Sequence, residues 1–565
     1  MGLFKSLLAA TVFVTFSSSV SGEKHPERPE WAGIWGIWGG QNYGGPDWPW
    51  YKGTIVHTTW AEIEPTEGQW DFSEFNEHLK EAADRGLFIG VKVYHGNGTP
   101  EWVYDKGVPR VENTKGKVYP YYLDPEFQPL LFRMIREVAA NIRTLTPEIL
   151  ERIVVLQAPA GKSGDPQPYQ GIVPEEFRID WAKGEEWRDW NQAVFREYAD
   201  AFSDLKDQLT IIIKPNEELH DHFLNEMPSL GRKTWSTAQG YQANSEMNYE
   251  WLREDLMATD RLPILRGRGE FDHAVREQRP WFVEAPAWNM YWQCLWMLTY
   301  GLDMFNQRTQ TLDDPGDYIE AFSFFSQFAG YKNPATSPSA WCALRDGLDY
   351  LDTERFPETT FGEIADGKNP KRYRAILKVM APFGAKNGDA EMLETGTHSY
   401  YQRLRALNDV AYNIWPGNYR NFLYEIDPQE HGQGYWRVGP KEQPYGRFAR
   451  GFNHSARRDA LYFDLDDKFF RDGQNVVKSA KVRVVYFDEG TGSWSISYDG
   501  IDDSDGDRFT VKKTDSGLWK EVVFLIEDGR FANQGSKGSD IALIDVDQED
   551  DIFHMVQFLR LQDSP

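Results

Sequence analysis

Cysteine is scarce in this chain, since only Cys294 and Cys342 occur among 565 residues. Two thiols cannot supply the disulfide framework of a small secreted scaffold. Both cysteines lie among aromatic and apolar neighbours in expected helices, so one disulfide and two buried free thiols are both open. Neither arrangement points to a metal or redox centre, and we expect no cofactor.

Long apolar runs are absent after the first residues. Residues 1–22 have a basic start, a short apolar run and a small-residue exit, which together predict a secretory signal peptide. The apolar run is too short to span a bilayer, and no later stretch is long enough to do so. We therefore expect a secreted or periplasmic protein that does not insert into a membrane.

Basic residues are outnumbered, because 61 Lys and Arg stand against 87 Asp and Glu and give a net charge of -26. This charge repels nucleic acid and anionic membrane surfaces at long range, which argues against both as partners. Aromatic residues are abundant instead, with 22 Trp, 27 Tyr and 34 Phe. Most of these rings individually serve a core, but flat rings with polar edges also suit the C–H faces of sugars. A carbohydrate is the expected partner, and the oligomeric state is left open.

Short β-like runs alternate with amphipathic helical segments from Trp31 to about Gln307, as in βα units around a parallel sheet. Eight runs over this span predict an α/β fold, a (β/α)8 TIM barrel with its core over about residues 31–310. The runs are Trp31–Gly39, Thr54–Thr59, Leu87–Tyr94, Ile153–Gln157, Leu209–Lys214, Thr234–Gln239, Pro263–Glu270 and Asp303–Gln307.

Two further regions follow the barrel. Residues 308–430 are mostly helical in pattern and predict an extension, so that the catalytic domain covers residues 23–430. In residues 431–565, runs such as Ser493-Trp-Ser-Ile-Ser-Tyr alternate apolar and polar side chains between Gly- and Asp-rich turns. This alternation indicates an antiparallel β-sandwich as an accessory domain.

The ends of the strands are where a barrel of this type gathers its reactive groups. The first run leads to Trp48 and Trp50 in a Gly/Pro-rich loop, where rings are hard to bury and predict a sugar-stacking wall. The second and third runs lead to Trp60 and His95, which we place on the same substrate-binding rim.

Arg266, Arg268 and Glu270 stand at alternate positions of one expected strand, so their side chains share one face. We expect two cations and a carboxylate to converge there. At the open end of a barrel, the carboxylate suits a nucleophile and the guanidinium groups suit an anion or a sugar hydroxyl. The alternative is an ion-pair ladder on a surface strand.

A longer motif carries a family resemblance. Trp60-x-Glu62-x-Glu64-Pro-x-x-Gly-x-Trp70-Asp-Phe, followed by a helix, a strand and Pro100-x-Trp102, resembles the second and third βα units of clan A glycoside hydrolases. Within that clan it is most similar to family 42 β-galactosidases and related enzymes that act on algal galactans. The resemblance implies a nucleophilic carboxylate on the seventh strand and an acid/base carboxylate after the fourth.

Glu270 fits the nucleophile by strand number and by facing. A retaining glycosidase needs two carboxyl groups roughly 5 to 5.5 Å apart, one ionised and one protonated. Arg266 and Arg268 would lower the pKa of Glu270, which suits a nucleophile. The alternative is a carboxylate that these arginines satisfy without any catalytic duty.

The fourth strand departs from the clan pattern, because no Asn-Glu follows Ile153–Gln157 and Asp165 is the first carboxylate. Either Asp165 reaches in from its Gly-rich loop, or Glu218 substitutes, or the protein is not a hydrolase. Glu218 would share a face with Lys214 and Asn216 if the fifth strand continues that far. As alternatives, Asp165 is a turn residue and Glu218 caps a helix.

Several neutral and cationic side chains complete the expected site. Gln157 and Asn216 would hydrogen-bond sugar hydroxyls. A cationic set would bind a sulfate or carboxylate on the sugar chain, or be neutralised pairwise within the barrel. Its members are Lys92, Lys214, Arg266 and Arg268. The histidines lack metal-ligand spacing, so we expect no metal site.

Three functions compete on this evidence. The leading one is a secreted, retaining glycoside hydrolase for a galactose-containing polysaccharide, with or without sulfate groups, or for its oligosaccharides. The second is a polysaccharide lyase acting on a uronate-containing glycan. The third is a glycan-binding barrel protein without catalytic activity.

Overall fold

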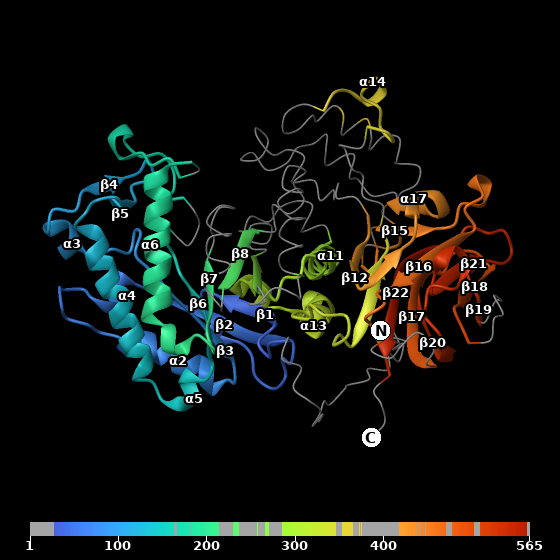
Figure 1. Ribbon diagram of the computed structural model, residues 1–565, viewed down its shortest axis with the longest axis horizontal. Helices are drawn as coiled ribbons and strands as arrows, with labels where there is room; N and C mark the ends of the chain where they lie inside the picture. Colours follow the sequence, from blue (N-terminus) through green and yellow to red (C-terminus); the bar gives the residue numbers. More distant parts are fainter. Residues whose placement is uncertain are drawn as a thin grey trace, which may run out of the picture.

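The computed structural model of the protein shows a barrel and a β-sandwich side by side, with α11 (Pro286–Thr299) and α13 (Ile319–Phe328) between them (Figure 1). It describes residues 28–162, 167–181, 183–213, 230–236, 257, 266–270, 285–345, 353–364, 372, 375, 417–436, 438–440, 442–446, 448–470, 477–501 and 509–561. For 230–236, 270 and 436 the description covers the backbone only.

The barrel is a closed ring of parallel strands in the order β1-β10-β9-β8-β7-β6-β3-β2. All eight expected runs form barrel strands, although β8 begins four residues earlier than the run Thr234–Gln239. The strands are β1 (Gly33–Ile37), β2 (Tyr51–Thr59), β3 (Phe88–Tyr94), β6 (Ile153–Gln157), β7 (Thr210–Ile213), β8 (Leu230–Ser236), β9 (Arg266–Glu270) and β10 (Met304–Gln307).

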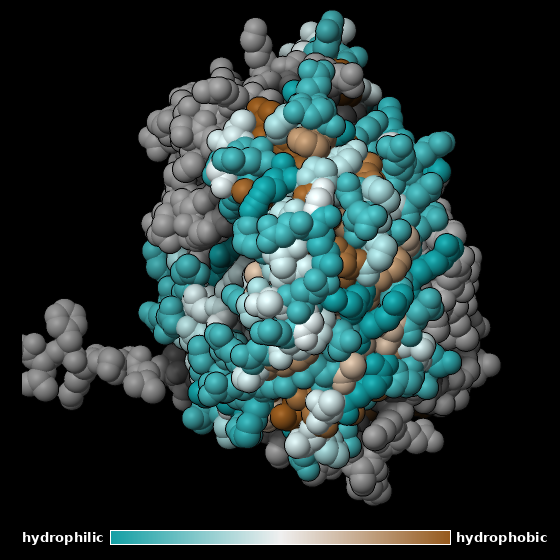
Figure 2. Space-filling view, turned by 90° about the vertical axis from the view of Figure 1, so that its left-hand side faces the viewer, coloured by the Kyte–Doolittle hydropathy of each residue, from teal (hydrophilic) through white to brown (hydrophobic). Residues whose placement is uncertain are grey.

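Helices cover the outside of the ring. α4 and α6 each turn an apolar stripe to the strands, and the face that carries them is mostly hydrophilic toward solvent (Figure 2). None of the helices described is both long and apolar enough to cross a membrane. The described helices are α1 (Trp60–Ile63), α2 (Ser73–Asp84), α3 (Glu101–Asp105), α4 (Phe127–Arg143), α5 (Pro147–Leu150), α6 (Glu185–Ala201), α11, α12 (Thr309–Leu312), α13, α14 (Glu358–Phe361) and α17 (Pro428–His431).

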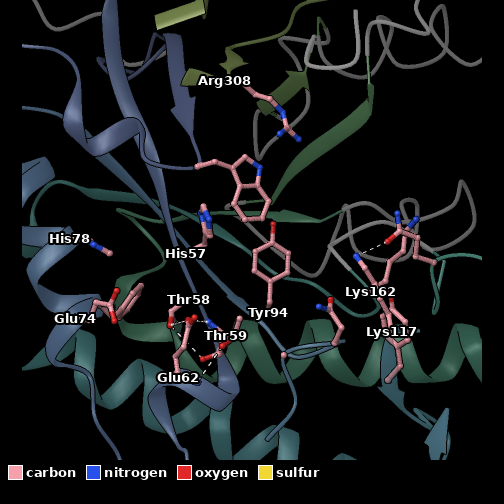
Figure 3. Close-up of a pocket in the computed structure, with 16 residues that line it drawn as sticks. His57, Thr58, Thr59, Glu62, Glu74, His78, Tyr94, Lys117, Lys162 and Arg308 are labelled. Atoms are coloured by element: carbon pink, nitrogen blue, oxygen red, sulfur yellow. Dashed lines mark hydrogen bonds between the residues drawn. The ribbon is translucent and has the colours of Figure 1, made fainter. Parts of the chain in front are cut away.

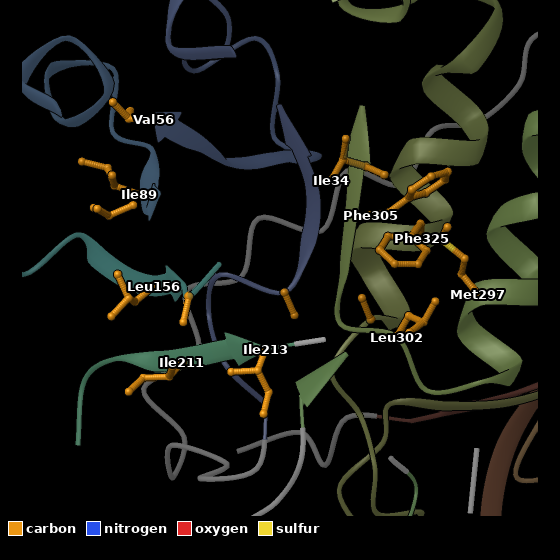
Figure 4. Packing of buried hydrophobic residues seen from close by; sticks show 14 of the residues in the cluster. Ile34, Val56, Ile89, Leu156, Ile211, Ile213, Met297, Leu302, Phe305 and Phe325 are labelled. Atoms are coloured by element: carbon orange, nitrogen blue, oxygen red, sulfur yellow. The ribbon is translucent and has the colours of Figure 1, made fainter. Parts of the chain in front are cut away.

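Alternation along the strands divides the barrel into an inner and an outer core. Outward side chains such as Ile34, Val56 and Phe305 pack toward the helices (Figure 4). Their inward neighbours form a separate cluster inside the ring, which includes Trp35, Ile55, Val155, Ile212 and Met304. The short continuous apolar runs in the sequence therefore reflect strands that are buried on both faces of the ring.

Trp35 fills the centre of the ring. Its ring is fully buried, and its Nε1 donates a hydrogen bond to the carbonyl of Trp31 at 2.8 Å. Gly53 and Gly90 on neighbouring strands leave the space that the indole occupies, because a Cβ at Gly53 would lie 2.8 Å from the Trp35 ring. The bulk of Trp35 is thus accommodated by two glycines, which have no side chain.

The β-sandwich begins earlier than residue 431, where the sequence placed it. Its sheets contain β11, β12 and β13, which lie inside the segment expected to be a helical extension. The seven-stranded sheet holds β11 (Ser339–Ala343), β12 (Tyr419–Asn421), β14 (Gln433–Trp436), β15 (Phe448–Gly451), β17 (Lys478–Phe487), β20 (Trp519–Gly529) and β22 (Ile552–Arg560). The five-stranded sheet holds β13 (Leu423–Glu425), β16 (Ala460–Leu465), β18 (Ser493–Tyr498), β19 (Phe509–Lys512) and β21 (Ile541–Asp545).

The sandwich is joined to the barrel through α11. Trp288 and Trp292 of this helix both donate Nε1 hydrogen bonds to the carbonyl of Gly446. The Tyr291 hydroxyl lies 3.0 Å from Nε2 of His554, which is fully buried on β22. Cys294 on α11 and Cys342 on β11 are buried free thiols, which decides between the two alternatives left open by the sequence.

We predict that Gly53→Ala destabilises the barrel. The added methyl group would lie 2.6 Å from the carbonyl oxygen of Phe88 as well as against Trp35. Overpacking of this kind lowers the free energy of unfolding by about 1 to 3 kcal/mol, measurable by urea denaturation. Gly316→Ala is the control, because its nearest neighbour is an Asp314 oxygen at 3.5 Å. Equal stability of the two variants would contradict the fitted role of Trp35.

Candidate active site

A cleft of about 710 Å³ opens at the mouth of the barrel, over the C-terminal ends of β1, β2 and β3 (Figure 3). Catalytic sites of closed parallel barrels lie at this end, because the βα loops converge there. The lining residues are Trp38, His57, Thr58, Thr59, Glu62, Glu74, Phe75, His78, Tyr94, Asn97, Gly98, Lys117, Tyr119, Lys162, Gln170 and Arg308.

Trp38 is the first residue after β1 and forms an aromatic platform in the cleft. Its side chain is 46% exposed, stacks on Tyr94 with ring centroids 5.6 Å apart and meets the ring of His57 edge-on. Its φ of 56° lies in the left-handed region, which costs about 1 to 2 kcal/mol for a residue with a side chain. A strained, exposed tryptophan on an aromatic support is a surface suited to a sugar ring.

His57 lies near the C-terminal end of β2 and meets Trp38 inside the cleft. Burial lowers the pKa of His57 to about 4, and the charge of Lys92 acts in the same direction. The imidazole is therefore neutral at physiological pH. Figure 3 shows His57 and Tyr94 together in the middle of the cleft.

Glu62 and Glu74 are the two carboxylates of the described cleft. The carboxylate of Glu62 caps α1. It accepts hydrogen bonds from Thr59 N at 2.8 Å and Thr58 Oγ1 at 2.9 Å. Burial opposes its charge, but these hydrogen bonds outweigh that effect and lower the pKa of Glu62. It is thus an ionised capping residue, unsuited to donate a proton.

Glu64 is the centre of the motif that carries the family resemblance. Its fully buried carboxylate accepts hydrogen bonds from Trp60 Nε1 at 2.8 Å and Gly68 N at 2.7 Å and forms an ion pair with Arg133. Trp102 Nε1 donates to its carbonyl at 3.0 Å. The motif therefore ties the loops after β2 and β3 to α4, and Glu64 itself supports the cleft without lining it.

Glu270 ends β9, which is the seventh barrel strand in chain order, as the sequence predicted. Its Cα is in register with that of Asn306 on β10. Asn306 is fully buried, and neither atom of its amide has a hydrogen-bond partner among the described residues. Arg308, two residues after Asn306, lines the cleft. The C-terminal end of β10 therefore lies next to the cleft.

Gln157 and Arg268 are brought together inside the barrel. Both side chains are buried, and Arg268 Nη1 donates a hydrogen bond to Gln157 Oε1. Lys92 is also buried, with its Nζ 4.1 Å from the centroid of the Tyr94 ring. These three expected site residues form part of the floor below the mouth, where only a group that enters the barrel can reach them.

Arg266 does not converge with Arg268 and Glu270, which corrects the sequence-based expectation. It forms an ion pair with Asp303 at 3.2 Å at the opposite end of the barrel, where Lys332 Nζ lies 3.1 Å from the same carboxylate. Alternate residues do share a face, but β9 rises about 3.3 Å per residue, so its ends lie about 13 Å apart. The cationic set of the sequence analysis is therefore divided.

None of the three tryptophans expected on the substrate rim lines the cleft. Trp50 is 4% exposed and Trp60 is fully buried, so neither ring offers a face to a sugar. Trp48 stacks on Trp50 with centroids 4.9 Å apart, directly before β2 begins, which is the end of the barrel opposite the cleft. The loop after β1 returns to that end before the second strand starts, and Trp38 is the ring that stays at the mouth.

His95 follows β3 but is fully buried behind the cleft, where its Nε2 lies 2.8 Å from the carbonyl oxygen of Pro159. Burial lowers the pKa of His95 to about 4, and Lys92 acts in the same direction. A buried neutral imidazole that orders the loop after β6 explains this residue better than contact with substrate. The expected catalytic residues Asp165 and Glu218, together with Lys214 and Asn216, lie outside the described residues.

Most of the cleft was not predicted from the sequence, including Trp38, His57, Tyr94, Lys117, Lys162 and Arg308. One signal for Trp38 was available, because a Trp-Gly-Gly directly after a strand indicates a tight turn that holds a large ring at the strand end. The other side chains come from five separate segments, and only closure of the barrel brings them together.

Two groups of side chains in the β-sandwich hold ligand atoms of metal-binding types within 4.8 Å of one another. They are Asp427, Glu430 and His431, and His454, Asp459 and Asp545. Both groups are partly exposed, and Asp545 already accepts hydrogen bonds from the backbone of Asp547 and Gln548. They belong to the sandwich and contribute nothing to the cleft, so we assign no metal to them.

No family model matches the chain, and no curated protein matches it. Among solved structures it is similar to xylanase B from Clostridium stercorarium F9, at 14% identity and a TM-score of 0.23 over 42% of this chain and 62% of that one. It is similar to a β-galactosidase from Marinomonas ef1, at 12% identity and a TM-score of 0.31 over 48% and 53% of the two chains. It is also similar to xylanase 10B from Thermotoga maritima, at 12% identity and a TM-score of 0.28 over 49% of this chain and 82% of that one.

The chain thus spans 62% and 53% of the first two enzymes, which is less than two thirds of each. At these identities and TM-scores, neither substrate nor activity is carried over from them. The fold is established by the strand order of the chain itself, a closed parallel ring followed by two antiparallel sheets.

We predict that His95 makes the protein sensitive to acid. The unfolded chain takes up a proton on this residue near pH 6.5 and the folded chain only near pH 4, so acidification between these values favours unfolding. In His95→Gln, the loss of unfolding free energy between the two pH values should shrink by about 2 to 3 kcal/mol, measured by urea denaturation. His431→Gln controls for loss of a histidine as such. An unchanged pH dependence in His95→Gln would contradict the assignment.

Proposed function

We propose that this protein is a secreted glycoside hydrolase that cleaves a galactose-containing polysaccharide, or its oligosaccharides, with retention of configuration. The observation that carries the proposal is an open cleft at the C-terminal end of a closed parallel barrel, with an exposed tryptophan stacked on a tyrosine inside it. Such a barrel end is the place for chemistry, and such rings are suited to sugars.

Glu270 is the nucleophile in this proposal. It stands at the end of the seventh strand, in register with Asn306, whose buried amide has both polar atoms unpartnered among the described residues. A buried amide costs free energy unless a partner satisfies it, and a sugar hydroxyl or the nucleophile's carboxylate would do so. Asn306 thus supports a polar ligand beside Glu270.

The proton donor is supplied by Asp165 or Glu218 in this proposal. The described end of β6, Gln157 to Ala160, contains no carboxylate, and Glu62 is occupied as a helix cap. A retaining mechanism needs a protonated carboxyl group opposite the nucleophile, which first protonates the departing oxygen and then deprotonates the attacking water. Secretion through the expected signal peptide would place this activity where polysaccharides are found.

A polysaccharide lyase is the second candidate, and His57 is the observation that favours it. The neutral imidazole lies beside Tyr94 in a cleft that Lys117, Lys162 and Arg308 also line. A lyase uses such a base to remove the proton next to a uronate carboxylate, which cations neutralise. Its product carries a new double bond that absorbs ultraviolet light, whereas a hydrolase product does not.

We predict that Glu270→Gln abolishes hydrolysis. On agarose, porphyran and carrageenan, release of reducing ends should fall about a thousandfold or more, because the substituted amide cannot attack the anomeric carbon. Glu151→Gln is the matched control, an exposed glutamate at the opposite end of the barrel. Full activity in Glu270→Gln would remove Glu270 from the mechanism, and ultraviolet-absorbing products would favour the lyase. Binding without turnover of any substrate would favour a non-catalytic glycan-binding protein.

We predict that Trp38→Ala weakens substrate binding with less effect on the chemical step. Loss of a stacking ring costs about 1 kcal/mol, so KM for oligosaccharides should rise roughly five- to tenfold while kcat changes less. Trp38→Phe keeps a ring at the same strained position and should recover most of the affinity. A variant that loses kcat with an unchanged KM would contradict the role of Trp38 as a sugar platform.

A further inference from the structure

A second hollow of about 560 Å³ lies on the loop between β6 and α6. Lys162 lines both this hollow and the cleft, so the two meet at that lysine. The second hollow is lined further by Gln167, Tyr169, Ile172, Arg178 and Trp181. We call this second hollow the cleft extension, because it adjoins the cleft at Lys162.

The cleft extension is built on a hydrogen-bonded support. A hairpin of β4 (Arg110–Glu112) and β5 (Val118–Pro120) lies beneath it, and Thr114 N donates to the carbonyl of Ile172 at 2.9 Å. Asn113 Nδ2 donates to the carbonyl of Gln170 as well. Residues 170–172 are therefore held in a defined position against the hairpin, which a binding surface requires.

Cations gather where the two hollows meet. Lys117 Nζ is hydrogen-bonded at 3.0 Å to Gln170 Oε1, a neutral amide, and forms no ion pair among the described residues. Arg178 is exposed and likewise forms no ion pair with a described carboxylate. In Figure 3, Lys117 and Lys162 lie on one side of Tyr94, whereas Glu62 and Glu74 lie on the other. In a chain with a net charge of -26, Lys117 and Arg178 form a local exception, because neither makes an ion pair within the described part of the chain.

Large apolar side chains are exposed beside these cations. Trp181 is 40% exposed and Ile172 is 65% exposed, and both line the second hollow. A flat ring next to a guanidinium group combines a stacking surface with a donor fork for an oxyanion. The cleft shows the same combination of a ring and cations, because it is lined by Trp38, Lys162 and Arg308.

We propose that the cleft extension binds a polysaccharide chain through its anionic groups, sulfate ester or carboxylate, at sugar units beyond those seated on Trp38. This inference rests on the proposed function and names its substrate class as an anionic, extended glycan. Lys117, Lys162 and Arg178 hold the anionic groups, and Trp181 stacks on a sugar ring between them. A chain bound on both sides of the point of cleavage is cut internally, so the action is of the endo type.

The test is a binding experiment with the full chain that needs no turnover. Lys117→Gln/Arg178→Gln is compared with the wild type on a sulfated galactan, the same galactan after chemical desulfation, and a polyuronate. Arg85→Gln/Lys206→Gln is the matched control, because it removes the same charge from exposed residues at the opposite end of the barrel. Titration calorimetry at two salt concentrations gives affinity and its salt dependence.

The double variant should lose at least tenfold in affinity for the anionic glycan and show a weaker salt dependence, while the control variant and the desulfated galactan show no such change. The arm that responds distinguishes sulfate from carboxylate. Equal affinity of the wild type for charged and uncharged chains would overturn the inference, as would equal binding of a nucleic acid homopolymer. If glycan binding depends on these residues but no bond is cleaved, anionic glycan binding at the cleft extension stands, whereas the proposed hydrolase and its endo action fail.

Discussion

The hydrogen-bonded pairing of β1 with β10 is the constraint on which the rest of the site depends. It joins residues near the start of the described chain to residues near 305 and closes the ring, with Gly33 opposite Met304 and Gly36 opposite Gln307. Trp38 and Arg308 follow these two strands directly and therefore meet at one cleft. An open sheet would leave the same side chains on two distant edges. The closed ring also holds Trp35 at its centre, so closure and packing support each other.

The motif that resembles clan A glycosidases has a structural explanation in this chain. Its acidic residue Glu64 is buried under three hydrogen-bonding or ionic partners, and its other acidic residue Glu62 caps a short helix. A buried carboxylate with this many donors is costly to disturb, because removing one partner leaves the charge uncompensated. The motif therefore reports how the second and third βα units are held together. It says little about which groups react.

Charge is distributed unevenly between the chain as a whole and the rim of the cleft. The acidic surface repels polyanions at long range, but salt screens this repulsion over about 8 Å at physiological ionic strength. Lys117, Lys162 and Arg178 act within that distance, on groups that a chain already seated in the cleft presents to them. A ligand must therefore first fit the cleft by shape, against the long-range repulsion, before the cations at the rim can bind its anionic groups. This requirement suits a polysaccharide better than a nucleic acid.

The order of the barrel strands was within reach of the sequence, because a strand that is buried on both faces leaves a short apolar run bounded by turn residues. The place of Glu270 on the seventh strand followed from counting those runs, and the β-sandwich followed from strict alternation near the C-terminus. The start of the sandwich did not follow, because β11 is a short, wholly buried strand whose pairing partner β22 lies more than 200 residues away.

The tertiary structure decided which side chains meet. Alternation shows that Arg266 and Arg268 share a face. Only the closed ring shows that Arg266 meets Asp303, which also contacts Lys332, whereas Arg268 meets Gln157 further along the barrel. Composition shows many tryptophans, but burial separates Trp38 from Trp50 and Trp60. A local pattern reports the period and face of one segment, whereas a site is a contact between segments whose distance along the chain carries no information about their distance in space.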